Sequence, residues 1–172
     1  MEHPRRREMP VVRDLPPNLM REIGRVIVFH AYVEWQLSLI IHDFLHLTKV
    51  LGRLADRDTR AMDRFDLICD LIDLKNVKTP VDLIRLRKSL VSVTTQRDLL
   101  AHGTWTRDPQ TKYFFLRLAG GSWKPMKSKK VQIKRSIKRG AAQYGIEECR
   151  SLNQLIGGII LTVDRLHLDT LG

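Results

Sequence analysis

The sequence predicts a mainly α-helical bundle of about four helices, with a small antiparallel β insertion before the last helix. Apolar residues recur at alternating spacings of three and four over residues 19–47, 83–100 and 152–166, as in helices that pack lengthwise. Between residues 103 and 140 this period gives way to short alternating and aromatic segments separated by Gly and Pro, which favour strands and turns. A chain of 172 residues can bury one such core without disulfides or a metal.

The first helix is predicted to be the spine of the bundle. Residues 1–17 are rich in proline and charge, so we expect a flexible or strap-like N-terminal arm before it. Pro16-Pro17-Asn18 favours a helix start. A helix of about eight turns would be unusually long for this domain. Its apolar seam comprises Leu19, Ile23, Val26, His30, Val33, Leu37, Ile40, Phe44 and Leu47.

Two further helices are predicted before the β insertion. Gly52 ends the connection after the first helix, and a helical pattern resumes over residues 60–74. In the loop over residues 75–80, Thr79 is placed to cap the next helix and Pro80 to occupy its first position. We expect that helix to stop at Gly103, since glycine is common just past a helix end. Its seam comprises Leu83, Leu86, Leu90, Val93, Arg97 and Leu100.

The β insertion is predicted to contain a hairpin, with strands at residues 104–106 and 113–116 and a turn at 108–110. Alternation over residues 131–137 indicates a third strand. A final helix is expected over about residues 147–168, with Gly157-Gly158 at a close approach to another helix. The chain is thus an arm over 1–17 and a single domain over 18–172, in which 103–140 form a basic insertion.

Charge indicates a polyanionic partner. The formal net charge is +11, and one stretch contains eight basic residues and no acidic one. Such a stripe suits a phosphate backbone, although a solvated, solubilising surface remains open. The two cysteines fit a reducing compartment, and no apolar run reaches the roughly 20 residues that cross a bilayer. We therefore expect a cytoplasmic protein that does not bind membranes. The stripe comprises Lys124, Lys127, Lys129, Lys130, Lys134, Arg135, Lys138 and Arg139.

Arg97 is the main candidate for chemistry because it occupies an apolar seam. A guanidinium there costs several kcal/mol unless an anion meets it. Glu34 on the first helix could supply that anion, in which case an Arg97–Glu34 pair would only join two helices. His102 lies roughly 140° from Arg97 on a regular helix. We expect a loosened last turn before Gly103 to let His102 swing toward the face of Arg97.

Metal and nucleophilic sites are not predicted. His42 and His46 have the spacing of a zinc-binding helix, with Asp43 where the metalloprotease pattern has Glu. No third ligand is evident, so no metal or other cofactor is expected. The Ser residues and Cys149 have no paired base in a recognisable arrangement, which argues against nucleophilic catalysis.

The segment Arg97-Asp98-Leu99-Leu100-Ala101-His102 resembles the R-φ-x-x-x-H motif of the HEPN superfamily, in which φ is Asn, Asp or His. A long first helix with an acidic residue among apolar ones (His30-Ala31-Tyr32-Val33-Glu34-Trp35) is similar as well. The resemblance implies an α bundle that dimerises so that two Arg/His pairs face one cleft. Many members are metal-independent endoribonucleases, often toxins or defence effectors with an antitoxin partner, and others only bind.

The resemblance implies catalytic roles for Arg97 and His102, with Asp98 in support and Glu34 as a further candidate. His102 would move a proton to or from the ribose, and Arg97 would hold the scissile phosphate of RNA. Asp98 would orient either side chain. The basic stripe would track the RNA, and Trp105, Tyr113 and Trp123 could stack on bases. Trp105 and Tyr113 could instead form the apolar face of the sheet. The alternative function is a non-catalytic module that binds RNA or a protein partner.

Overall fold

The computed structural model describes residues 11–55, 59–107, 114–118 and 141–171. This part contains five α-helices and three strands, which confirms the mainly helical fold with a long first helix and a β insertion before the last. The short helix α2 is additional. The elements in chain order are α1 (Pro17–Phe44), α2 (Lys49–Ala55), α3 (Ala61–Lys75), α4 (Leu83–His102), β1 (Gly103–Arg107), β2 (Phe114–Leu118), β3 (Ala141–Gln143) and α5 (Ile146–Leu171).

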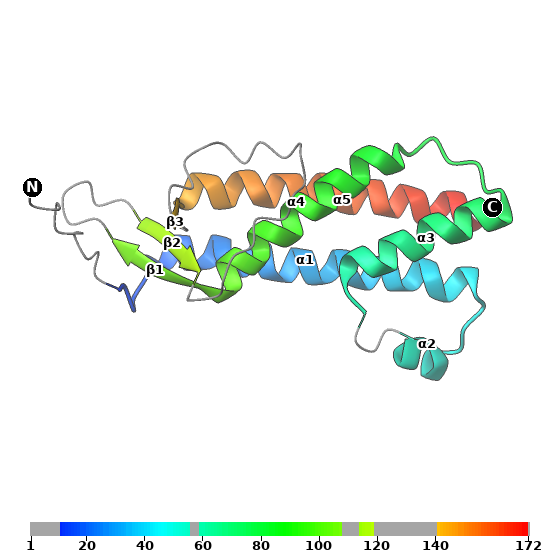
Figure 1. The fold of residues 1–172 in the computed structure, drawn as a ribbon, viewed down its shortest axis with the longest axis horizontal. Helices are drawn as coiled ribbons and strands as arrows, with labels where there is room; N and C mark the ends of the chain where they lie inside the picture. Colours follow the sequence, from blue (N-terminus) through cyan, green and yellow to red (C-terminus); the bar gives the residue numbers. More distant parts are fainter. Residues whose placement is uncertain (1–10, 56–58, 108–113, 119–140, 172) are drawn as a thin grey trace, which may run out of the picture.

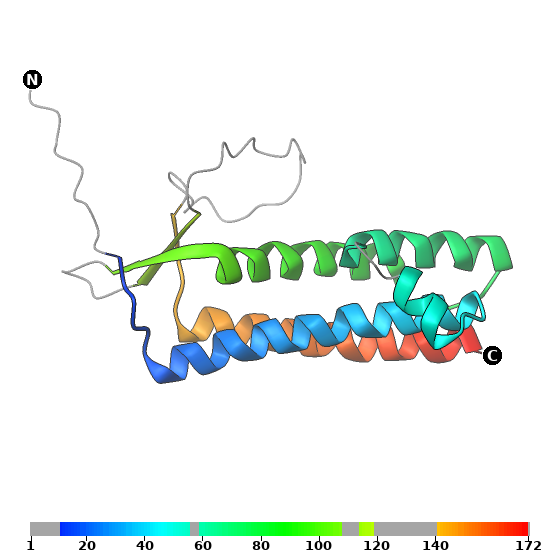
Figure 2. The same cartoon turned by 90° about the horizontal axis from the view of Figure 1, so that it is seen from below.

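The long helices form two layers (Figures 1 and 2). Helices α1 and α5 lie side by side along the whole molecule, and α3 and α4 cover one face of that pair. Side-chain hydrogen bonds join Glu22 to Asn153 near the start of both helices and Gln36 to Asp164 further along both. The two helices therefore run parallel. The first helix contacts α3, α4 and α5 and is therefore the spine that the sequence predicted.

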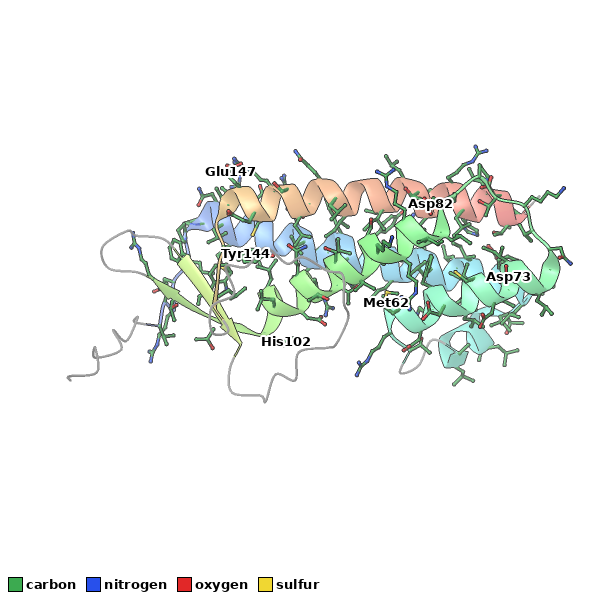
Figure 3. All side chains as sticks on the ribbon, turned by 45° about the horizontal axis from the view of Figure 1, so that its top comes forward. Met62, Asp73, Asp82, His102, Tyr144 and Glu147 are labelled. Atoms are coloured by element: carbon green, nitrogen blue, oxygen red, sulfur yellow. The ribbon has the colours of Figure 1, made fainter. Side chains whose placement is uncertain are left out.

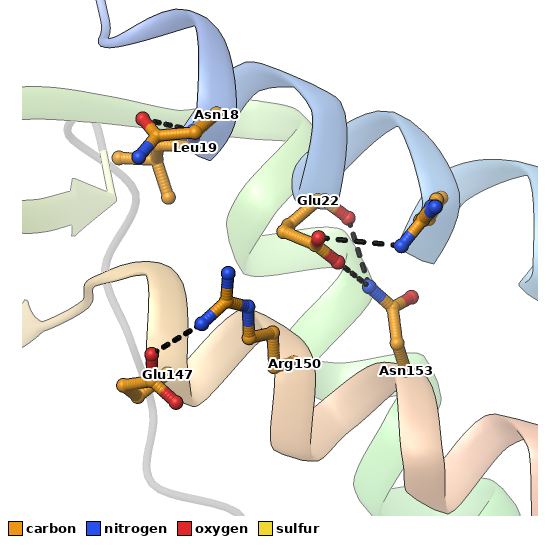
Figure 4. A network of polar contacts seen from close by, with 7 residues as sticks. Asn18, Leu19, Glu22, Glu147, Arg150 and Asn153 are labelled. Carbon is orange, nitrogen blue, oxygen red and sulfur yellow. Dashed lines mark hydrogen bonds and ion pairs between the residues drawn. The ribbon is translucent and has the colours of Figure 1, made fainter.

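A buried carboxylate helps to join α1 and α5. Glu22 is buried, and its carboxylate accepts a hydrogen bond from Asn153 Nδ2 at 2.9 Å (Figure 4). Arg25 pairs with the same carboxylate at 3.3 Å. Because the charge is compensated by these donors, a buried acid is tolerated between two apolar helices. Around it the core is continuous, with fully buried side chains from all four long helices, among them Val26, Leu37, Phe65, Leu90, Ile156 and Leu166.

The sheet caps one end of the bundle, beside the start of α1 and α5 (Figure 1). Its order is β1-β2-β3 and both pairings are antiparallel, with Trp105 opposite Leu116. This confirms the predicted hairpin. The third strand is Ala141–Gln143, whereas the predicted strand over residues 131–137 lies outside the described residues. The described end of the N-terminal arm contacts β1, since Val12 donates its backbone N–H to Trp105 O at 2.8 Å.

Several helix ends differ from the prediction for local reasons. Proline occupies the first turn of α1, as expected, but the helix ends at Phe44, before Leu47. Gly52 lies inside α2 instead of ending the connection. The cap of α4 is Asp82, whose carboxylate accepts from Arg85 N at 2.9 Å, while Thr79 donates to Asp169. The aspartate is the better cap because its oxygen reaches the orphan N–H directly.

The glycines also act differently from the prediction. Gly103 follows α4 as expected, but its φ of −79° is not left-handed. A Cβ there would lie 2.5 Å from the backbone oxygen of Leu99 and 2.7 Å from Leu116, so glycine permits close packing of β2 on α4. Gly157 and Gly158 were expected at a close helix contact, yet apart from the nearby backbone of α5 itself no described atom lies within 4 Å of a Cβ at either.

Candidate functional site

The candidate site lies where α1 packs on α4, and His30 is its most buried member. This side chain is 1% exposed. Its Nε2 lies 3.0 Å from Thr94 Oγ1 of α4, within hydrogen-bond distance. Its Nδ1 lies 3.6 Å from Glu34 Oε1, which is an ion-pair distance but too long for a hydrogen bond. The His30 ring therefore stands between an α4 hydroxyl and an α1 carboxylate.

Arg97 lies one turn after Thr94 on α4, and its partner is Asp98. Arg97 Nη1 donates to Asp98 Oδ1 at 2.8 Å, so the seam arginine does meet an anion. The alternative Arg97–Glu34 pair is not among the contacts of the described residues. The side chain is 27% exposed, because its head reaches the surface while its stem packs in the seam. Its Nε is buried and has no hydrogen-bond partner in the described part of the chain.

Glu34 connects a third helix to this contact. Its carboxylate is 29% exposed, so it is accessible from solvent. Arg64 of α3 donates from Nη1 to the backbone oxygen of Glu34 at 3.3 Å. Ser38 donates to the same oxygen at 3.1 Å. The backbone at Glu34 is thus fixed from two sides, while its carboxylate is left to face His30 and solvent.

The electrostatics of the contact favour a neutral His30. Burial lowers the pKa of His30 below its ordinary value, and the Arg97 guanidinium lowers it further. Glu34 and Asp98 oppose this shift without reversing it. A carboxylate can only accept hydrogen bonds, so the neutral ring faces Glu34 favourably when Nδ1 carries the proton. Nε2 is then the acceptor for the Thr94 hydroxyl.

His102 does not reach Arg97 within the chain. Helix α4 stays regular up to His102, which lies at its junction with β1 (Figure 3). The loosened last turn expected from the sequence does not occur, because Gly103 continues directly into β1. His102 is exposed, and no hydrogen bond or ion pair to it is found among the described residues. Asp98 therefore orients Arg97 rather than His102.

The predicted RNA-binding residues fall into two groups. Trp105 is only 9% exposed and packs edge-on against Phe114 with ring centres 6.4 Å apart. This burial favours the alternative in which the Trp105 indole forms the apolar face of the sheet. The basic stripe from Lys124 to Arg139, together with Tyr113 and Trp123, lies outside the described residues.

The histidine pair with zinc-like spacing does not share a helix face. His42 lies on α1 with its ring over Gly52, whereas His46 follows the helix end with a φ of +51°. Asp43 instead bonds His167 of α5 at 2.5 Å. No group of residues able to hold a metal ion is found in the described ranges, and none of the described helices is long and apolar enough to span a bilayer.

Two residues of the site were missed by sequence reasoning. His30 was placed in the apolar seam of the first helix but given no role. Like Arg97, it is a polar residue among apolar ones, which indicates that it needs a polar partner. Thr94 has no sequence signal, because threonine is common on half-buried helix faces. No family model, curated protein or solved structure matches the chain. Its function must therefore be argued from these residues.

Proposed function

We propose that this protein is a metal-independent endoribonuclease of HEPN type that cleaves RNA by attack of the ribose 2′-hydroxyl. Arg97 holds the scissile phosphate and His102 transfers a proton near neutral pH. Asp98 fixes the guanidinium. The products carry a 2′,3′-cyclic phosphate. The proposal includes the cytoplasm as its location, and a role as a toxin or defence effector would add an antitoxin partner.

The observation that carries the proposal is the exposure and the hydrogen bonding of the Arg97 guanidinium. Its head is partly exposed, Asp98 holds Nη1, and the buried Nε has no partner among the described residues. A guanidinium held from one side can offer its remaining N–H groups to a phosphate without losing much side-chain entropy. An arginine that served only to join helices would be paired across the α1–α4 contact instead.

Dimerisation is part of the proposal, because one chain does not bring His102 to Arg97. An exposed apolar strip on α1 supports a second copy docking beside Glu34. Val28, Tyr32 and Trp35 lie on one face of α1, and Trp35 is 53% exposed and pairs with Tyr32 at 5.4 Å between ring centres. Exposed aromatic residues of this kind are enriched in protein interfaces. Replacing Trp35 by Lys should convert the dimer to a monomer in light scattering and abolish cleavage.

The main experiment is cleavage of single-stranded RNA in EDTA. Arg97→Ala and His102→Ala should each lower the rate by about 100-fold or more. Arg87→Ala is the matched control for Arg97, since Arg87 is an exposed arginine of α4 paired with Asp66. His46→Ala is the control for His102. Both controls should retain wild-type rates.

The outcomes separate the two functions. Full activity in His102→Ala would refute its role. RNA binding that weakens with salt, without strand scission by the wild-type protein, would favour the non-catalytic binding module. Loss of activity in the Arg87 or His46 control would point to a folding defect instead of lost chemistry.

A further inference from the structure

His30 is the most buried polar group of the candidate site, and the ribonuclease mechanism above gives it no task. Its ring joins the two helices that carry the candidate residues, through Thr94 on α4 and Glu34 on α1. A buried imidazole nitrogen without a hydrogen bond destabilises the folded protein, because the loss of its hydration is not compensated. Nδ1 of His30 is such an atom, and the Glu34 carboxylate stands 3.6 Å from it.

We propose that His30 is a positioning residue which, anchored by Thr94, orients the Glu34 carboxylate to accept the proton of the ribose 2′-hydroxyl. This inference rests on the ribonuclease function proposed above. A small movement of the accessible Glu34 side chain closes the Nδ1–H···Oε1 hydrogen bond when substrate binds. Catalytic hydrogen bonds are often long in the free enzyme and tighten in the complex.

The assignment gives each proton a defined path. As the 2′-oxygen attacks the phosphorus, its proton passes to Glu34. The bond from phosphorus to the 5′-oxygen breaks, and the leaving 5′-oxygen takes a proton from the His102 imidazolium. Arg97 holds the charge of the phosphoryl group throughout. Glu34 thus becomes the base and His102 the acid, and no co-reactant is required.

The charged groups around the ring fit this role. Glu34 lies on its own helix, Arg97 and Asp98 on α4, and Arg64 of α3 bonds the Glu34 backbone. The neutral ring can donate a hydrogen bond to Glu34 without placing a positive charge beside the carboxylate that is to accept the proton. Nothing in this arrangement requires His30 to touch the substrate.

The test is a double-mutant cycle on RNA cleavage in EDTA. Glu34→Gln should lower kcat about 100-fold, as expected for loss of a general base, with KM little changed. His30→Gln should lower kcat about tenfold or more in the wild-type background and have no further effect in the Glu34→Gln background. A merely structural role predicts losses that multiply, because a packing defect acts independently of the Glu34 charge.

A second pair of variants covers the case in which His30→Gln does not fold. Thr94→Val keeps the shape of the side chain but removes the hydroxyl, and it should lower kcat, whereas Thr94→Ser should restore it. Thr95→Val is the matched control, since the Thr95 hydroxyl donates to Val91 O within the exposed face of α4 and does not contribute to the α1–α4 contact described above. Imidazole nitrogen NMR should place the His30 proton on Nδ1.

The outcomes are distinguishable. No cleavage by the wild-type protein overturns the ribonuclease proposal and this inference with it. Cleavage that is unaffected by His30→Gln or Thr94→Val, or losses that multiply in the cycle, overturns this inference alone. A His30 proton found on Nε2 also overturns it, because that tautomer cannot donate to Glu34.

Discussion

Replacing Gly103 by alanine should test how the end of α4 is joined to the sheet. The backbone at Gly103 has a φ of −79°, which any residue can adopt, so alanine introduces no conformational strain. Its methyl group would instead lie 2.5 Å from Leu99 O and 2.7 Å from two carbon atoms of the fully buried Leu116. The backbone oxygen cannot rotate away, so β2 or the last turn of α4 must shift. Overpacking of this kind costs about 1–3 kcal/mol.

The matched control is Gly157→Ala in the interior of α5. Apart from the nearby backbone of α5 itself, no described atom lies within 4 Å of a Cβ there, so alanine should stabilise the helix by about 0.5–1 kcal/mol. Urea unfolding of both variants, monitored by circular dichroism, measures the difference. A Gly103→Ala protein as stable as the wild type would refute the close packing of α4 on β2. Unchanged m-values would show that both variants unfold from a native state of the same compactness.

Three further predictions concern stability and reactivity. The pKa of folded His30 lies below the unfolded value of 6.5, so the unfolded chain takes up a proton that the folded chain resists. The contribution of His30 to the free energy of unfolding is therefore complete above pH 6.5 and is lost as the pH falls below 6.5, by at most about 1.4 kcal/mol per pH unit. Thermal melts of His30→Gln at several pH values should lack this part of the pH dependence. Asp82→Ala should cost about 0.5–2 kcal/mol in urea unfolding, because it removes the cap of α4. Cys149, whose pKa burial raises to about 12, should not react with a thiol reagent at pH 8 until the protein unfolds, whereas half-buried Cys69 should react slowly.

The helices could be predicted because their signal is repeated over many residues. The seams of α1, α4 and α5 each alternate spacings of three and four, and most seam positions are buried in the structure. Helix ends depend on single contacts, and the cap of α4 was missed for this reason. The oxygen of Asp82 caps α4 while Thr79 bonds Asp169 of α5, far away in the sequence. No local pattern reveals that the threonine is engaged elsewhere.

The site could be predicted only in part for the same reason. The seam position of Arg97 correctly indicated that it needs an anion, but the partner expected from the seam was Glu34, and Asp98 was expected only to orient Arg97 or His102. Its neighbour Asp98 pairs with it, and Glu34 faces His30 instead. The choice depends on how α1 is rotated against α4, which sets whether His30 or Glu34 points at the contact. The apolar stripe of a helix is about 100° wide or more, so apolar periodicity does not specify which single residue faces the neighbouring helix.

The charge balance of the α1–α4 contact bears on how the proposed chemistry would bind RNA. With His30 neutral, the guanidinium groups of Arg97 and Arg64 only balance the carboxylates of Glu34 and Asp98. A phosphate approaching this contact alone would therefore gain no net electrostatic attraction from it. RNA binding therefore needs positive charge from outside the contact, either from a protonated His102, which a second copy would bring to Arg97, or from the basic stripe at residues 124–139. The net charge of +11 shows that the chain carries this excess, although the contact itself does not.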